Sequence, residues 1–279
     1  MTHAKNDEIR LFDSHCHLDM EVFRDNFDDV LTRAAEAGVR RALLAACDLR
    51  SSVKVINIAR EVKRPDIAFF ASAGVHPHEA NSIRGGLPHE FEKLAADREV
   101  AAIGEIGLDY FYDNSPRDVQ RAVFETQLEW AERAKKPILV HLRNDPVRDA
   151  GDAYGEAMAA IANHPKLSGG VIHCFSGNID DARRALDLGF YISFAGPVTY
   201  PKSSELHEAA AYVPIDRILC ETDSPYLPPQ RMRGRRNEPA FVRDVYEKIA
   251  QLRGVSLNKF AASVWKNGEK LFGVSGFDL

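Results

Sequence analysis

The sequence contains few cysteines, and they do not form the pairs that cysteine-based sites require. Its four cysteines are spread over 279 residues without a C-x-x-C pair: Cys16, Cys47, Cys174 and Cys220. A zinc ribbon and a thioredoxin-like redox motif both need such a pair. The sequence therefore excludes both kinds of site, and we expect the thiols to be reduced and mostly buried.

The chain also lacks any long hydrophobic run. No stretch reaches the roughly eighteen apolar residues of a membrane span, and the N-terminal segment MTHAKNDEIR has no apolar core for a secretory signal. We therefore expect no contact with a membrane and a cytoplasmic location. Nothing in the sequence sets the oligomeric state, and a monomer is the expectation.

The chain has slightly fewer basic than acidic residues, which gives it a formal net charge of -5. This balance argues against binding nucleic acid over the whole surface, but it does not exclude a local basic patch. One such patch is RMRGRR at residues 231–236. Hydrophobic residues make up 45% of the chain, which is enough for the substantial core of a globular protein.

Short apolar runs alternate with longer amphipathic segments along nearly the whole chain. The apolar runs are residues 9–18, 41–48, 67–77, 100–110, 137–143, 169–177, 190–198 and 217–227. Helical patterns between and after them cover residues 27–38, 117–136, 179–189, 238–254 and 258–273. Near-continuous apolar strands alternating with helices indicate a parallel sheet, and eight strands favour a closed barrel. We predict an α/β fold: a single (β/α)8 TIM barrel with an additional C-terminal helix, forming one domain over residues 1–279.

Polar residues gather at one end of these apolar runs, where they are costly unless they are paired or bound to something. In a barrel this end is the C-terminal rim of the strands, where βα loops build active sites. We therefore expect six residues to converge on one mouth: His15, His17, Glu105, His141, His173 and Asp223.

The segment FDSHCHLD at residues 12–19 carries the clearest signal. Because strand side chains alternate, His15 and His17 share a face while Cys16 points toward the helices. Two imidazoles at one point suit zinc, manganese, cobalt or nickel, whereas Mg²⁺ prefers more oxygen ligands. A single histidine at a strand end is more often a hydrogen-bonded core residue. The joint pattern of six residues nevertheless predicts a metal site.

Six ligands exceed what one tetrahedral metal requires, so they indicate two divalent ions that share a carboxylate. Glu105 is the candidate bridge. One ion would take His15, His17 and Asp223, and the other would take the two later histidines. Such a pair, about 3.5 to 4 Å apart, holds a hydroxide nucleophile and neutralises charge on a phosphoryl group. Asp223 would be the general base, and with Glu105 it is a candidate catalytic residue. The expected ions are divalent metals: Mg²⁺, Mn²⁺ or Zn²⁺.

Eight motifs follow one another along the chain: FDSHCHLD, AGVHPHEA, AIGEIGLDY, PILVHLR, VIHCFSG, YISFAGPVTY, ETDSPYLPP and RGRRNEP. Together they resemble the TatD family of metal-dependent deoxyribonucleases, within the amidohydrolase-like barrels. The resemblance runs from about residue 10 to Gly273. It implies a TIM-type barrel, a divalent-metal centre and hydrolysis of phosphodiester bonds in DNA. Family members are described as 3'-5' exonucleases, which implies single-stranded or frayed DNA ends as the substrate.

The resemblance also assigns roles to individual residues. By this match, the first metal-binding pair is His15 and His17, the shared carboxylate is Glu105, the second-site histidines are His141 and His173, and the aspartate of the ETD motif is Asp223. Glu221 of the same motif would either assist metal binding or form a buried ion pair with an arginine. Two loops depart from the family pattern, HLRNDPVRDAG and PPQRMRGRR, but neither departure touches a proposed ligand.

Candidate substrate-binding residues lie on the same rim. Four arginines follow the eighth apolar run: Arg231, Arg233, Arg235 and Arg236. Guanidinium groups match phosphate oxygens, so we expect Arg233 and Arg235 to contact a nucleic-acid backbone. The alternative is a solvated loop, or pairing with acidic neighbours such as Glu238.

Histidines and aromatic residues supply further candidates on the rim. His76, in GVHPHEA, is expected to donate to a phosphate or a leaving group, whereas His78 is expected to face outward. Four aromatic residues lie in rim loops and would either stack on a base or pack against the protein: Tyr110, Phe111, Tyr112 and Tyr226.

Two other functions stay open from the sequence. The same metal centre could hydrolyse an amide, lactone or ester, such as a D-aminoacyl-tRNA, although the rim arginines favour phosphate. A non-catalytic barrel with a structural metal is the other alternative. Structural sites are closed by four ligands, commonly cysteines, whereas histidines and carboxylates with room for water favour catalysis.

Overall fold

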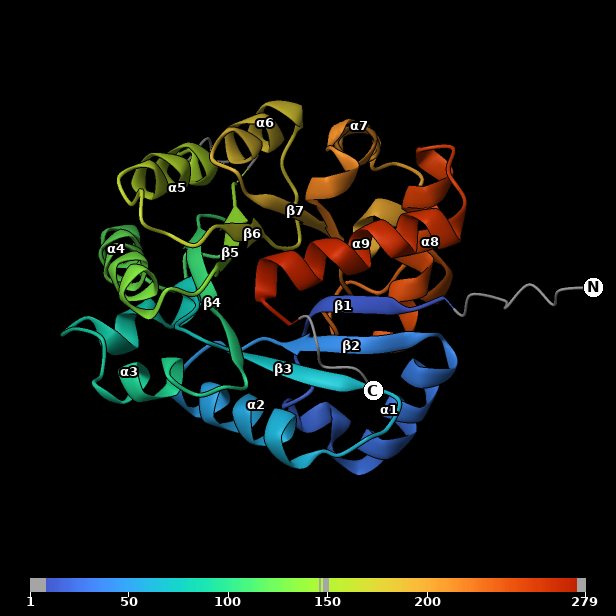
Figure 1. The fold of residues 1–279 in the computed structure, drawn as a ribbon. Coiled ribbons are helices and arrows are strands. Elements are labelled where there is room, and N and C mark those ends of the chain that lie inside the picture. The colour runs from blue at the N-terminus through green and yellow to red at the C-terminus, as the bar shows by residue number, and fades with distance from the viewer. Residues whose placement is uncertain (1–8, 146, 148–150, 275–279) are drawn as a thin grey trace, which may run out of the picture.

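The computed structural model describes residues 9–145, 147 and 151–274. Within them, eight strands form one sheet in which each strand pairs in parallel with the next. The strands are β1 (Leu11–Cys16), β2 (Val39–Leu44), β3 (Ala68–Ala73), β4 (Val100–Asp109), β5 (Ile138–Arg143), β6 (Gly170–Ile172), β7 (Tyr191–Phe194) and β8 (Ile218–Cys220). Figure 1 shows the strands curling into a ring with helices around it. The predicted (β/α)8 barrel is confirmed.

One α-helix follows each strand, and a further helix ends the described chain. The α-helices are α1 (Phe27–Glu36), α2 (Leu49–Glu61), α3 (Glu90–Ala95), α4 (Arg117–Ala134), α5 (Ala153–Ala162), α6 (Ile179–Asp187), α7 (Ser204–Tyr212), α8 (Val242–Leu252) and α9 (Leu257–Phe272). Short 3-10 helices lie at Glu21–Asn26, Pro77–Ile83, Gly196–Thr199, Ile215–Arg217, Gln230–Met232 and Pro239–Phe241. Local signals set several ends. For example, Asp48 caps α2 through the N–H of Ser51, at 2.6 Å, and α9 ends at Gly273 with a φ of 65°.

The ring closes between β1 and β8 through a few specific contacts. The N–H of Asp223 donates to the carbonyl of His15 at 2.9 Å, and the N–H of His17 donates to the carbonyl of Ser224 at 2.8 Å. Deeper in the barrel, Asp13 accepts the hydroxyl of Thr222 at 2.6 Å and its N–H at 2.8 Å. These bonds place the H-x-H segment directly beside Asp223.

Three of the six candidate ligands lie just beyond their strands. β1, β6 and β8 end at Cys16, Ile172 and Cys220, so His17, His173 and Asp223 occupy the first residues of the following loops. Two of these loops turn through left-handed backbone conformations, with a φ of 55° at Asp223 and 44° at Cys174. Such conformations are costly for residues other than glycine and are often found at functional sites.

Strand β4 carries the central carboxylate on a bulge. Gly104 pairs with Leu139 of β5 and Ile106 pairs with the next residue, Val140, so Glu105 has no partner of its own in this ladder. A bulge of this kind turns a side chain away from the regular alternation of the strand. The bulge therefore gives Glu105 a direction that simple strand parity does not predict.

The backbone of β4 also approaches β5 unusually closely at Gly107, two residues after Glu105. A Cβ atom on Gly107 would lie 1.9 Å from the carbonyl oxygen of His141, and Gly107 has a φ of 144°. Only glycine fits there, because any side chain would displace the β5 backbone that carries His141.

The predicted additional C-terminal helix is α9, which packs against the barrel near β1 and β8 (Figure 1). Its Trp265 and Phe272 contact Phe12 of β1, with ring centroids 6.4 and 5.8 Å apart. Gly268 lies against the same ring, where a Cβ would be 2.3 Å from Phe12. Among the described residues, no helix combines the length and apolar character needed to cross a membrane.

Candidate metal centre

The structure brings all six predicted ligands together at the barrel mouth, around the two oxygens of Glu105. The first group gathers at Oε2, which lies 3.4 Å from His15 Nε2 and 3.8 Å from His17 Nε2. These two nitrogens are 3.1 Å apart. Asp223 completes the group, because its Oδ1 lies 3.6 Å from His15 Nε2 and 3.4 Å from His17 Nε2. This is the set predicted for one ion.

The second group gathers at the other oxygen of Glu105. Oε1 lies 2.7 Å from His173 Nε2 and 3.1 Å from His141 Nδ1, and these two nitrogens are 3.2 Å apart. The side chains of both groups are buried, except that of His141, which is half-buried. Glu105 therefore faces one set of ligands with each oxygen, which is the arrangement of a carboxylate shared between two sites.

The remaining nitrogen of three of these histidines faces a hydrogen-bond acceptor. His141 Nε2 lies 2.9 Å from Asp109 Oδ2, and His173 Nδ1 lies 3.2 Å from Glu221 Oε1. His17 Nδ1 lies 3.2 Å from the carbonyl oxygen of Ala45. Because these oxygens accept, the three outer nitrogens donate. A neutral imidazole then presents an unprotonated nitrogen to the centre, as metal-ligating histidines do.

The second group shows why this cluster fits a cation. His141 Nδ1, His173 Nε2 and Glu105 Oε1 lie within 3.2 Å of one another, and with neutral imidazoles all three are acceptors. Buried acceptors facing each other without a donor are strongly unfavourable. A proton or a metal ion must therefore lie among them. Imidazole nitrogen with carboxylate oxygen is a common donor set for Zn²⁺ and Mn²⁺.

The pKa values show how the cluster behaves without metal. Burial would raise the pKa of Glu105, but His173, His76 and other nearby histidines hold that pKa well below its ordinary value. Burial would lower the pKa of His173, but the charge of Glu105 raises it well above its ordinary value. The pKa of His141 is raised against burial by its hydrogen bonds to Asp109 and Glu105. Protons on these imidazoles thus stand where a cation would bind, and metal must displace them.

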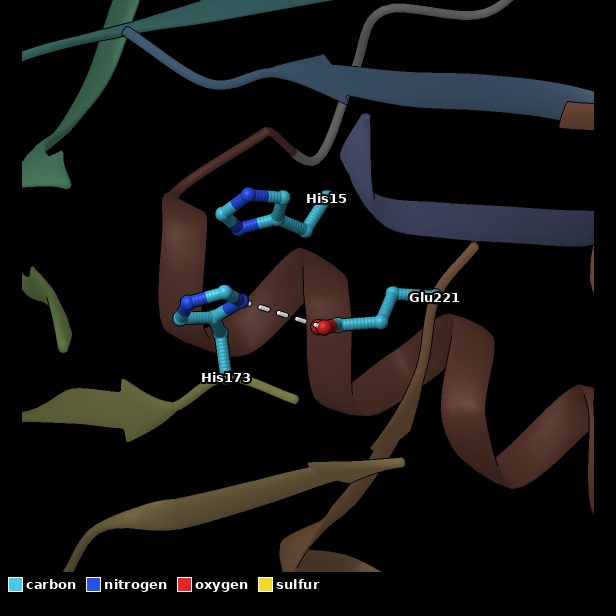
Figure 2. Close-up of side chains that lie close together, drawn as sticks. All are labelled: His15, His173 and Glu221. Atoms are coloured by element: carbon cyan, nitrogen blue, oxygen red, sulfur yellow. Dashed lines mark hydrogen bonds and ion pairs between the residues drawn. The ribbon is translucent and has the colours of Figure 1, made fainter. Parts of the chain in front are cut away.

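Glu221 orients a histidine rather than pairing with an arginine. Its Oε1 accepts from His173 Nδ1 and from the N–H of Cys174, the latter at 2.7 Å. Figure 2 shows Glu221 reaching His173 while the ring of His15 lies parallel to that of His173, with centroids 3.9 Å apart. These three residues also lie close enough to hold an ion. The expected alternative of a buried pair with an arginine is wrong, because no arginine among the described residues bonds to Glu221.

His76 joins the cluster as a donor. Its Nδ1 accepts the N–H of His78 at 3.0 Å, so the neutral imidazole carries its proton on Nε2, which lies 3.3 Å from Glu105 Oε1. Burial lowers the pKa of His76 to about 4, which keeps the ring neutral. This geometry suits the predicted donor role. The expectation that His78 faces outward is wrong, because its Nε2 lies 3.0 Å from Asp109 Oδ2 and its ring lines the mouth.

Sequence reasoning missed Asp109. One oxygen accepts from His141 and His78, and the other accepts the N–H groups of Phe111 and Tyr112 at 3.0 and 2.9 Å. These hydrogen bonds hold the pKa of Asp109 below its ordinary value, although burial opposes them. The signal was available, because Asp109 lies at the same strand end as Glu105 in the segment AIGEIGLDY.

A cavity of about 630 Å³ opens over this cluster. Two exposed tyrosines line it, with 53% of Tyr112 and 51% of Tyr226 accessible to solvent. Tyr110 is buried and donates to Glu156, so it packs and cannot stack on a base. The cysteines are free, and two of them, Cys47 and Cys174, are half-buried in the cavity wall.

The predicted arginine cluster lies outside this cavity. Its four members are exposed and are absent from the described residues that line the cavity: Arg231, Arg233, Arg235 and Arg236. Arg231 pairs with Asp244 at 2.8 and 3.0 Å, whereas Glu238 pairs with Arg33. The substrate-binding role of Arg233 and Arg235 stays a prediction.

Comparison with known proteins agrees with a metal centre at this site. Residues 12–273 match the family model described as TatD related DNase. The uncharacterized metal-dependent hydrolase YcfH of Escherichia coli (strain K12) is 39% identical over 276 residues, covering 96% of this chain and 98% of its own. A protein of Escherichia fergusonii named 3'-5' ssDNA/RNA exonuclease TatD is 33% identical over 270 residues, covering 95% of this chain and all, 100%, of its own.

A solved structure supports the same relationship. The crystal structure of YJJV, a TatD homolog from Escherichia coli K12, superposes with a TM-score of 0.83 at 28% identity, covering 95% of this chain and 99% of that chain. The family match spans nearly the whole barrel, including every residue of the cluster around Glu105. The chain therefore belongs to the TatD family of metal-dependent hydrolases.

Proposed function

We propose that this protein is a two-metal phosphodiesterase that removes nucleotides from the 3' end of single-stranded or frayed DNA. The observation that carries the proposal is the position of Glu105, whose two oxygens each face a separate set of ligands. A single ion would use only one of these sets. Two ions on a shared carboxylate are typical of enzymes that act on phosphodiester bonds.

The residues around the centre divide the work of hydrolysis. Divalent ions bound there would polarise a phosphoryl oxygen and lower the pKa of water. Asp223 belongs to the first group. Without metal, the hydrogen bond from His17 lowers its pKa against the effect of burial, and beside bound cations it would stay ionised and able to accept a proton from attacking water. The N–H of His76 points to the centre near Glu105 and would stabilise negative charge on the phosphate or the leaving oxygen.

The choice of DNA rests on relatives and on the cavity. A relative is named as a single-stranded DNA and RNA exonuclease, and we extend that activity to this chain as part of the proposal. Tyr112 and Tyr226 are exposed at the cavity rim, where their rings would stack on unpaired bases. Unpaired bases occur at single-stranded and frayed ends, which are the substrates that an exonuclease of this kind degrades.

The test is the loss of nuclease activity in Asp223→Ala. With Mn²⁺, Mg²⁺ or Zn²⁺ present, the wild-type protein should release nucleotides from a single-stranded oligonucleotide labelled at its 5' end. Asp223→Ala removes both a ligand and the base, so kcat should fall by about 100-fold or more. Asp187→Ala, an exposed position at the end of α6, is the control and should keep full activity.

Three outcomes would contradict the proposal. Undiminished nuclease activity in Asp223→Ala would remove its assigned role. Shortening from the 5' end only, seen with the label at the 3' end, would reverse the polarity. Turnover of an ester or an aminoacylated RNA without any release of nucleotides would show that the metal centre acts on carbonyl carbon instead.

A further inference from the structure

Arg143 is placed where it can reach a substrate at the metal centre. It is the last residue of β5, two positions after His141, so the two side chains leave the strand on the same side. Arg143 is half-buried and lines the cavity over the centre. His141 and Arg143 therefore line the same cavity, with Arg143 two residues closer to the end of the strand.

Aromatic rings rather than carboxylates hold this guanidinium in place. Its central carbon lies 4.3 Å from the ring centroid of Phe111 and 4.9 Å from that of Tyr112. Stacking on ring faces leaves the N–H groups at the edge of the guanidinium available to other acceptors. No carboxylate of the described residues forms an ion pair with Arg143, in contrast to Arg231, which is held by Asp244.

Arg143 brings a permanent positive charge to the cavity. Arg143 is the single arginine or lysine among the described residues that line it. The rings that position it belong to the loop after β4, whose backbone is tied to Asp109 and thereby to His141. Asp109 thus fixes the position of the rings that hold Arg143 relative to His141, a proposed metal ligand.

We propose that Arg143 binds a non-bridging oxygen of the substrate phosphate beside the metal centre and so selects phosphodiesters over neutral esters. This inference deepens the proposed function and rests on it for the identity of the substrate. A guanidinium forms two parallel hydrogen bonds to phosphate oxygens, whereas a neutral ester offers no charge and one acceptor of matching geometry. Arg143 is accordingly a binding residue that determines specificity.

The experiment compares Arg143→Met, Arg143→Lys and Arg217→Met. Arg217 is the matched control because its guanidinium also stacks on a tyrosine, Tyr191, at 5.4 Å, but it lies just before β8 and outside the cavity. Each variant is titrated with Mn²⁺, and the Mn²⁺-loaded protein is then titrated with inorganic phosphate. Release of nucleotides from a single-stranded oligonucleotide is measured separately.

Arg143→Met should weaken phosphate binding by about tenfold or more, because a charged hydrogen bond is lost, while Mn²⁺ affinity stays within about twofold. Arg143→Lys should lie between Arg143→Met and wild type, since lysine keeps the charge but not the fork. Nuclease kcat/KM should fall in the same order. Arg217→Met should match wild type in all three measurements.

The proposal is overturned if wild type binds no phosphate, if Arg143→Met binds phosphate as well as wild type does, or if it loses Mn²⁺ affinity in the same proportion. The last result would mean that Arg143 only supports the metal ligands. Failure of the proposed function looks different: phosphate binding would depend on Arg143, but wild type would release no nucleotides.

Discussion

The imidazole of His141 illustrates how single residues prepare this centre. Its Nε2 donates to Asp109, and its Nδ1 faces Glu105 and His173. The outer hydrogen bond fixes which nitrogen carries the proton and how the ring is turned. Asp109 is therefore a positioning residue: it bonds to His141 and to the loop after β4, and it decides which nitrogen His141 offers to a metal.

Asp109→Asn should weaken metal binding without unfolding the protein. An amide has one acceptor oxygen, so it can accept either from His141 or from the N–H groups of the loop after β4, whereas the carboxylate accepts from both. The charge that makes the imidazole a stronger ligand is also gone, so Mn²⁺ affinity should fall by about 10- to 100-fold. Isothermal titration with Mn²⁺ measures this directly. Asp244→Asn, which disturbs only the pair with Arg231, is the control and should bind Mn²⁺ as wild type does. Equal affinities in all three proteins would refute the positioning role.

Among the elements, the junction of β1 and β8 does the most to assemble the site. The sheet is paired continuously from β1 to β8, but its closure depends on an isolated bridge between Cys16 and Ser224 and on the bonds between Asp13 and Thr222. A short ladder gives few backbone hydrogen bonds, so the buried side chains there carry more of the pairing. The first and last of the six proposed ligands, His15 and Asp223, are neighbours because this junction holds.

Thr222→Val should destabilise the barrel by about 1–3 kcal/mol, because it leaves the buried Asp13 oxygen without its hydroxyl donor. Chemical denaturation monitored by circular dichroism gives the change in the free energy of unfolding. Thr126→Val on α4 is the matched control, since that hydroxyl bonds only to the carbonyl of Ala122 one turn earlier. A loss no greater than that of the control would show that the Asp13 contact does not close the ring.

For the molecule as a whole, the metal centre links distant parts of the chain. Its six proposed ligands come from five strands or the loops that follow them, between residues 15 and 223. Ions that bind only the folded arrangement stabilise it through the binding equilibrium. Metal should therefore hold the mouth of the barrel together as well as serve the reaction.

That the chain forms one domain stays a prediction.

Removing metal with a chelator should lower the melting temperature. At a free Mn²⁺ concentration of about 100 times Kd, binding contributes about 2.7 kcal/mol. The pKa values of His141 and His173 are raised, so protons fill these ligands as pH falls and leave them as pH rises. The stabilisation by Mn²⁺ should accordingly be larger near pH 8 than near pH 6.

Thermal unfolding with Mn²⁺ or chelator at both pH values measures this difference. Glu105→Gln removes the shared carboxylate and should abolish most of the effect of Mn²⁺ at either pH. If Mn²⁺ does not change the melting temperature of the wild-type protein at either pH, the proposed centre is contradicted.

The fold and the residues that meet at the barrel mouth could be predicted because both depend on patterns that are local in sequence. Alternating apolar runs and amphipathic segments predicted every strand of the barrel, and polar residues at the ends of the runs predicted which side chains share its mouth. The role of Asp109 was not predicted, because no fixed spacing in the sequence marks a carboxylate that bonds to a histidine on another strand. Likewise, the pairing of Arg231 with Asp244 joins two segments whose contact no local pattern reveals.

The sequence by itself determined the barrel and the identity of the six converging residues, because strand and helix periodicities and the cost of burying polar groups act residue by residue. Only the tertiary structure decided how Glu105 divides its oxygens, which nitrogen of each histidine faces inward, and that Arg143 rather than the later arginines lines the cavity. Those features depend on a bulge, on hydrogen bonds between distant strands and on the packing of one loop. They are set by distances in space and not by spacing along the chain.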